Sequence, residues 1–176
     1  MTEISIAAPA RAEDAAFVAE VTDLVNTVYA DGEKGIWVPG TARTDRDDLA
    51  SVIRAGELAV AQREGQVLGA VRVRRLPSGE GEFGMLAAHP AHRGIGLGRD
   101  LVAFAEGWAR DQGVSTMQLE VLFPNEWEHP TKVFLRDWYI RSGYQVVRKG
   151  DFSADYPALV PYLATACDYL IFNKTL

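Results

Sequence analysis

At residues 93–98 the sequence reads Arg93-Gly94-Ile95-Gly96-Leu97-Gly98, and this stretch decides the fold. It lies between a strand-like run, Phe83 to Ala88, and a helix-like run, Leu101 to Arg110. Glycines let a backbone approach a ligand closely, and a helix that begins just after such a turn presents N–H groups with no partner inside the helix. Those groups and the helix dipole together bind phosphate. The stretch therefore predicts a phosphate-binding turn between a strand and a helix.

The spacing of the glycines narrows the choice of ligand. The stretch lacks the Gly-Lys-Ser/Thr ending of a nucleotide P-loop and the full Gly-x-Gly-x-x-Gly of a dinucleotide fold. We therefore expect a pyrophosphate of another kind. The alternative is a glycine-rich turn that only connects two elements, which the alternate spacing of the glycines and the type of the flanking elements disfavour.

The longer stretch Gly84-Met85-Leu86-Ala87-Ala88-His89-Pro90-Ala91-His92-Arg93-Gly94-Ile95-Gly96-Leu97-Gly98 resembles the acyl-CoA signature of the GNAT acetyltransferase superfamily. The resemblance implies that N–H groups of residues 94–99 hold the pyrophosphate of CoA, and that main-chain groups near Leu86 and Ala87 bond its pantetheine arm. Asn125 is similar to the asparagine that touches this arm in the family, although here a longer loop separates it from the next helix. The cofactor-binding residues implied are Leu86, Ala87, Arg93, Gly94, Ile95, Gly96, Leu97, Gly98, Arg99 and Asn125.

Length and composition are those of one soluble domain over residues 1–176. The single cysteine, Cys167, excludes an internal disulfide framework and a cysteine-rich zinc site, and it favours a reducing, cytoplasmic location. No apolar run reaches the roughly 18–20 residues that a membrane helix needs. The net charge of −6 disfavours nucleic acid as a partner. His89, His92 and His129 are the only histidines, and no metal site is expected.

Hydrophobic periodicity and turn residues predict the order of elements. Strands are expected at Ile4 to Ala7, Leu58 to Gln62, Val67 to Leu76, Glu82 to Ala88, Thr116 to Leu122, Gln145 to Arg148 and Tyr169 to Phe172. Helices are expected at Phe17 to Tyr29, Leu49 to Ile53, Leu101 to Arg110, and from Pro130 to just before Gly143. Thr44-x-x-Asp47 resembles a capping box for the second helix. Asp31 to Arg43 is expected to be a mobile loop, and Asp151 to Ala166 a variable loop or short helix.

This order predicts an α+β fold with three layers, in which helices cover both faces of a mostly antiparallel central sheet. It also matches the order of elements in the GNAT superfamily across nearly the whole chain. The resemblance therefore implies a GNAT-like α/β/α domain.

Glu82 is the candidate general base. An alkyl amine has a pKa of about 10, so its proton must be taken, directly or through water, before the amine can attack a thioester. Glu82 precedes the signature at the interval where many GNAT enzymes carry a catalytic glutamate, and Glu80 would share its face of the strand. A carboxylate that faces apolar cleft walls can have its pKa raised toward the working range. The alternative is that both glutamates are solvated charges at the strand end.

Tyr139 is the candidate general acid. It lies in Trp138-Tyr139-Ile140-Arg141-Ser142-Gly143-Tyr144, which resembles the helix end where GNAT enzymes carry a tyrosine that protonates the departing CoA thiolate. From helical spacing alone, a tyrosine beside Trp138 and Leu135 favours packing. The resemblance favours catalysis.

These residues predict an acyl-CoA-dependent N-acyltransferase that moves an acyl group, most simply acetyl, from acetyl-CoA to a primary amine by direct attack in a ternary complex. The expected acceptor is a small-molecule amine held by the segments Tyr29 to Pro39, Asn125 to His129 and Asp151 to Ala166, with Trp37 and Trp127 as walls. Acetylation of a protein amine and a CoA-binding regulatory module without turnover are the alternatives. Whether the chain forms a homodimer is left open.

Overall fold

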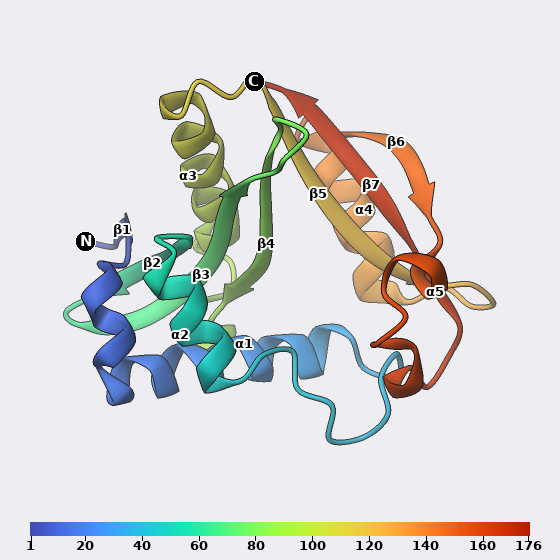
Figure 1. The fold of residues 1–176 in the computed structure, drawn as a ribbon, viewed down its shortest axis with the longest axis horizontal. Coiled ribbons are helices and arrows are strands. Elements are labelled where there is room, and N and C mark those ends of the chain that lie inside the picture. Colours follow the sequence, from blue (N-terminus) through green and yellow to red (C-terminus); the bar gives the residue numbers. More distant parts are fainter.

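The computed structural model describes residues 1–176 and contains a seven-stranded sheet with helices on both sides (Figure 1). The strands are β1 (Glu3–Ile6), β2 (Leu58–Arg63), β3 (Gln66–Arg75), β4 (Gly81–Ala88), β5 (Thr116–Pro124), β6 (Gln145–Gly150) and β7 (Cys167–Thr175). The α-helices are α1 (Ala15–Gly32), α2 (Arg46–Arg54), α3 (Leu97–Asp111), α4 (Pro130–Arg141) and α5 (Phe152–Asp155). Short 3-10 turns are η1 (Pro9–Glu13), η2 (Pro90–His92) and η3 (Val160–Tyr162).

The strands lie in the order β1-β2-β3-β4-β5-β7-β6, and every neighbouring pair is antiparallel except β4 and β5. The predicted α+β class and mostly antiparallel sheet are therefore confirmed. The one parallel pair arises because α3 crosses from the end of β4 to the start of β5, as a crossover connection requires.

Two hydrophobic clusters lie on opposite faces of the sheet. On one face α3 packs through Leu101 and Ala105, and α4 adds Tyr139 to the same cluster. On the other face α1 packs through Val21 and Val25, and α2 contributes residues such as Leu49 and Ile53. Figure 1 shows α1 crossing below the sheet, from the β2–β4 side to the region of α5.

The beginnings of two helices differ from the sequence prediction. The capping box at Thr44 is wrong, because α2 begins at Arg46 and the Asp45 side chain accepts the Asp48 N–H at 2.8 Å. Thr44 is buried, and its backbone is instead held by the Asn26 side chain, with N–H to Oδ1 at 3.0 Å. The central helix α3 starts at Leu97, inside the glycine stretch.

A bulge in β4 changes which residues face which layer. Met85 has a positive φ of 52°, and the β3–β4 register shifts between Ala70 and Arg72. Before the bulge Phe83 faces the α3 cluster, whereas after it Met85 and Ala87 belong to the α1 and α2 cluster. An inserted residue reverses the side of every residue that follows it.

Strands β4 and β5 are paired only at their beginnings. Gly81 lies opposite Met117 and Glu82 opposite Gln118, and no further pair follows. β5 is meanwhile paired with β7 along its whole length. Figure 1 shows the two strands diverging toward the end where α1 crosses. We call this region, beyond Glu82 and Gln118, the β4–β5 gap.

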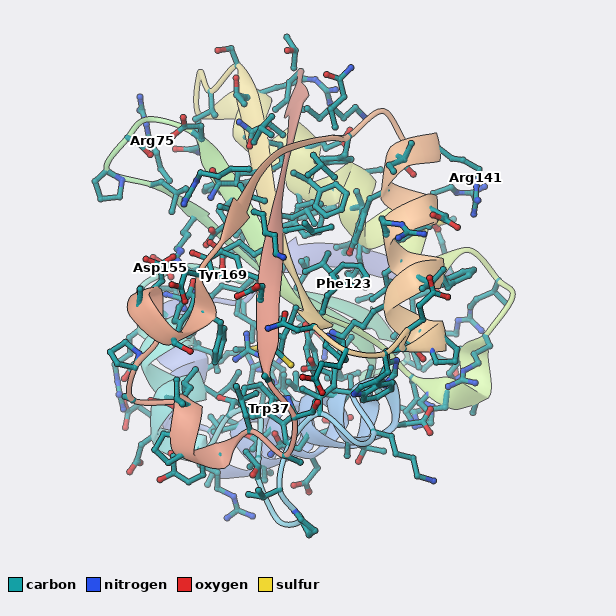
Figure 2. The ribbon with its side chains drawn as sticks, turned by 90° about the vertical axis from the view of Figure 1, so that its right-hand side faces the viewer. Trp37, Arg75, Phe123, Arg141, Asp155 and Tyr169 are labelled. Carbon is teal, nitrogen blue, oxygen red and sulfur yellow. The ribbon has the colours of Figure 1, made fainter.

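The late segment 151–166 forms α5 and η3, as a variable loop with a short helix, and is tied to the loop after α1. Trp37 and Leu163 form an isolated antiparallel bridge. The Val38 N–H donates to Tyr162 O, and the Ala164 N–H to Ile36 O, both at 2.8 Å. Trp37 lies below α5 in Figure 2 and packs edge-on against Phe152. The loop after α1 and the late segment, although far apart in the sequence, thus pack together, and we call the surface that they form the wall.

Candidate active site

The start of α3 presents backbone donors without acceptors. Gly96 caps the helix in the left-handed conformation, with φ 84°, which glycine adopts without strain. The first helical hydrogen bond runs from the Asp100 N–H to Gly96 O at 3.0 Å, and the N–H groups of Leu97, Gly98 and Arg99 have no partner within the chain. These donors lie at the positive end of the helix dipole, an arrangement that can bind an anion.

The side chains around these donors leave the turn accessible. A Cβ at Gly94 would have no neighbour within 4 Å, and one at Gly96 would meet only the Arg99 side chain. Arg93 pairs with Asp31 at 3.1 Å, and both side chains are exposed, so the pair can open at little cost. Ile95 is exposed, whereas Leu97 is buried in the core and anchors the helix. The turn thus combines free N–H groups with two exposed cations, Arg93 and Arg99.

Leu86 and Ala87 lie after the bulge, on the part of β4 that borders the β4–β5 gap. Their backbone faces β3 on one side, and β5 offers no pairing on the other. Buried backbone groups are normally hydrogen-bonded, so an edge of this kind inside a sheet is a place where a ligand can pair. The gap runs from this edge toward the start of α3.

The Tyr139 ring is buried in the α3 cluster, where it packs against Phe83 at 6.0 Å and Phe172 at 6.1 Å between centroids. Its hydroxyl makes no hydrogen bond within the chain, and the oxygen is not fully enclosed by protein atoms. Burial, and secondarily the charge of a nearby Tyr29, raises the pKa of Tyr139. The side chain is therefore a protonated phenol with an unused donor.

Tyr29, near the end of α1, was expected from the sequence as part of the first helix and as the first residue of the acceptor-holding segment Tyr29 to Pro39. Burial raises its pKa, while the Arg43 guanidinium and the Leu86 backbone act in the opposite direction. The Arg43 guanidinium lies 5.2 Å from the centre of the Tyr29 ring. Tyr29 thus reaches the gap from the α1 face, opposite Tyr139. Helical spacing alone gave no signal for this approach across the sheet.

Glu82 lies at the last position where β4 pairs with β5, and its carboxylate contacts the Arg74 guanidinium. Its Oε1 accepts from Arg74 Nη2 at 2.6 Å and Nε at 2.8 Å, and its Oε2 lies 3.5 Å from Gln118 Nε2. The expected apolar cleft walls are therefore replaced by a guanidinium, because Arg74 stands opposite Glu82 in the β3–β4 register. Glu80 precedes β4 and belongs to the turn, with Oε2 buried and without a partner.

A second carboxylate, that of Glu120, lies on β5 and on the same face of the sheet as Glu82. The Tyr156 hydroxyl donates to Glu120 Oε2 at 2.6 Å, which joins the late segment to the sheet. We call Arg74, Glu82, Gln118, Glu120 and Tyr156 the polar patch. Glu120 was not predicted from the sequence, because it fits an ordinary exposed strand position, and Tyr156 was expected only as part of the acceptor-holding segment Asp151 to Ala166.

Asn125 lies at the end of β5, on the side of β7. Its N–H donates to Ala166 O at 2.9 Å, and the residue borders two cavities, of about 640 Å³ and about 300 Å³. Trp127, half exposed, lines the smaller cavity and donates from Nε1 to Thr165 Oγ1 at 3.1 Å. The structure thus groups Asn125 and Trp127 with the wall of the late segment.

The other reactive side chains are structural. His129 is buried with Nε2 at 2.9 Å from Lys34 O, and His89 Nδ1 accepts the Ala91 N–H at 3.2 Å. Cys167 is buried, and burial raises its pKa to about 11. No three histidine, cysteine or acidic residues form a group that could hold a metal ion. None of the helices combines the length and apolar character that crossing a membrane requires.

The model of the acetyltransferase (GNAT) family matches residues 24–131. No match was found among curated proteins. Among solved structures, the PaiA N-acetyltransferase from Thermoplasma acidophilum, in complex with coenzyme A, is similar with a TM-score of 0.71 at 14% identity, over 100% of this chain and 99% of that chain.

Two larger proteins are also similar. N-acetylglutamate synthase from Neisseria gonorrhoeae, with coenzyme A and N-acetyl-glutamate, has a TM-score of 0.67 at 20% identity, over 100% of this chain and 35% of its own. A Bacillus anthracis protein described as a streptothricin acetyltransferase, with acetyl coenzyme A, has a TM-score of 0.54 at 15% identity, over 68% of this chain. The present chain spans 61% of the Bacillus protein.

Proposed function

The chain belongs to the acetyltransferase (GNAT) family, and from this premise we propose that it transfers an acyl group, acetyl first of all, from acyl-CoA to a primary amine of a small molecule. The observation that carries the proposal is the row of free N–H groups at the start of α3, next to the β4–β5 gap. The similar structures solved with coenzyme A or acetyl coenzyme A support the same donor.

The residues present fit a pyrophosphate and an extended arm. The N–H groups of Leu97 to Arg99 would hold the pyrophosphate, with the exposed cations Arg93 and Arg99 beside them. The open edge of β4 at Leu86 and Ala87 would pair with the amide groups of the pantetheine arm. Such pairing would direct the thioester into the gap.

Two side chains are proposed to act on the reacting groups. Tyr139 would donate its phenolic proton to the departing thiolate, since its hydroxyl is free and its raised pKa keeps it protonated. Glu82 would meet the acceptor ammonium on the opposite face of the sheet, within the polar patch. The amine would attack the thioester directly, with both substrates bound.

The acceptor would enter from the face that carries the polar patch. On this face the late segment brings Tyr156 over β5, and Trp37 is bridged to the same segment through Leu163. Figure 2 shows Asp155 and Tyr169, which are hydrogen-bonded, beside this wall. Carboxylates next to aromatic rings favour a cationic amine over an anionic acceptor.

The test supplies acetyl-CoA together with each of a panel of small primary amines. The CoA released is measured with a reagent that reacts with its free thiol. The proposal expects amine-dependent release and mass-spectrometric detection of the acetylated amine. Binding of acetyl-CoA without release by any small amine would contradict it. Adding lysine-containing peptides as acceptors then distinguishes acetylation of a protein amine from a CoA-binding module that does not turn over.

A further inference from the structure

Open space lies in the β4–β5 gap on the face of the polar patch. Gly84 follows Glu82 by two residues on β4, so both face the same side. A Cβ at Gly84 would have no neighbour within 4 Å. On β5, Glu120 follows Gln118 by two residues and therefore stands across the gap from Gly84. The space at Gly84 is thus bordered by one carboxylate from each strand.

The two carboxylates have different partners. Glu82 is held by two nitrogens of Arg74, and its side chain is largely buried. Glu120 forms no ion pair, and its one hydrogen bond within the chain is from the neutral Tyr156 hydroxyl. Two Arg74 nitrogens occupy Oε1 of Glu82, whereas no cation contacts the Glu120 carboxylate. Glu120 is therefore the carboxylate that remains available to accept a proton.

The groups around Glu120 also favour its role as a proton acceptor. It is faced by Glu82 on β4, Arg74 on β3, Arg148 on β6, Tyr169 on β7 and Tyr156 after α5. Glu120 is solvent-exposed on β5. Its partial removal from water by these neighbours is the largest influence and raises the pKa of Glu120, with the negative charge of Glu82 adding to it. The Tyr156 hydrogen bond and the two arginines oppose this rise without cancelling it.

We propose that Glu120 is a catalytic residue that takes the proton of the acceptor ammonium in the β4–β5 gap, while Glu82, fixed by Arg74, holds that ammonium in place. The inference rests on the proposed acyl transfer. It assigns to β5 a role that the sequence placed on β4, and it makes Tyr156 a positioning residue for Glu120.

One N–H bond of the ammonium breaks, its proton forms an O–H bond to Glu120, and the electron pair stays on nitrogen. That pair forms the bond to the acyl carbon, the C–S bond breaks, and the thiolate receives the Tyr139 proton. A second proton leaves nitrogen as the amide forms and restores Tyr139 by way of water. Glu120 returns its proton to solvent, so ammonium and thioester yield amide, thiol and one proton.

The experiment measures kcat/KM for the best amine between pH 6 and 10 in the wild type and in the variants Glu120→Gln, Glu82→Gln and Tyr156→Phe. At neutral pH we expect Glu120→Gln to lose roughly 10²–10⁴-fold in rate, the usual scale for a positioned proton acceptor. The loss should shrink as pH rises, because solution then supplies neutral amine. The KM for acetyl-CoA should not change.

The other variants give separate signatures. Glu82→Gln should raise the KM for the amine and lose rate equally at every pH, since it removes a binding contact. Tyr156→Phe removes the hydrogen bond that favours ionised Glu120, so the pKa of Glu120 rises and the acidic limb of the profile moves to higher pH. Glu3→Gln, at an exposed carboxylate on β1, is the matched control and should leave the profile unchanged.

Three results with an active wild type would overturn the role of Glu120: an unaltered Glu120→Gln variant, a loss in that variant that is equal at every pH, or recovery at high pH in Glu82→Gln alone. An unmoved acidic limb in Tyr156→Phe would overturn the positioning role. A wild type that releases no CoA with any amine would instead overturn the proposed function, and the inference with it.

Discussion

The ring centroids of Tyr139 and Tyr144 lie 5.9 Å apart, and only one of the two hydroxyl groups is hydrogen-bonded within the chain. Tyr144 donates to Glu106 Oε1 at 2.9 Å, and Lys174 contacts the same oxygen at 2.9 Å. The Tyr139 hydroxyl makes no hydrogen bond within the chain. One phenol is thus part of a buried polar network, and its neighbour is left available for a ligand.

Replacing Tyr139 by phenylalanine tests this difference. The ring and its packing stay, so stability and acetyl-CoA affinity should change little. Turnover should fall roughly 10²–10⁴-fold if the hydroxyl protonates the thiolate. The control is Tyr144→Phe, which should cost about 1–3 kcal/mol of unfolding free energy, because Glu106 loses a buried partner, with nearly normal turnover. Equal rates in the wild type and Tyr139→Phe would return Tyr139 to a packing role.

Gly98→Val tests the anion site at the start of α3. Gly98 lies in the first turn, and a Cβ there meets nothing closer than Trp138 at 3.9 Å, so the free protein accepts a larger residue. The added side chain would occupy the space next to the free N–H groups. We expect acetyl-CoA affinity, measured by calorimetry, to fall at least about tenfold, or about 1.4 kcal/mol. Gly107→Val, later in the same helix and also in open space, should bind normally.

The buried pair of Glu33 and Lys132 joins the end of α1 to the first turn of α4, with Nζ to Oε2 at 2.8 Å. Lys132→Met should lower the unfolding free energy by about 3–5 kcal/mol, because it leaves a carboxylate buried without a partner. Adding Glu33→Leu should recover most of this loss. Arg54→Met, in the exposed pair with Glu13, should cost less than about 1 kcal/mol in the same urea titrations.

Cys167 gives a prediction about pH. Burial raises its thiol pKa to about 11, whereas an unfolded thiol has a pKa of about 8.5. The unfolded chain therefore loses this proton first, and the contribution to stability falls as pH rises from roughly 8.5 toward 11. The folded thiol should react with a disulfide reagent at pH 8 at least about 100-fold more slowly than the unfolded one. Comparable rates would mean that the start of β7 opens freely.

The elements that could be predicted from the sequence are those that depend on neighbouring residues. The glycine turn before α3, the hairpin of β2 and β3, and the amphipathic faces of α1 and α3 could be predicted, because each depends on residues within one or two turns of chain. The capping error at Thr44 was also local, since Asp45 competes for the same helix start one residue later. Boundaries of this kind are decided by a single hydrogen bond.

The sequence alone determined the class of fold and the position of the glycine turn before α3, because glycine spacing and hydrophobic periodicity act through the backbone of neighbouring residues. Only the tertiary structure decided the chemistry around it. The bulge at Met85 sets which face each later residue of β4 occupies, and register places Arg74 against Glu82. The hydrogen bond from Tyr156 to Glu120 joins segments that meet only after the sheet and its covering wall have formed. Such contacts depend on strand order and long-range packing, which no local pattern encodes.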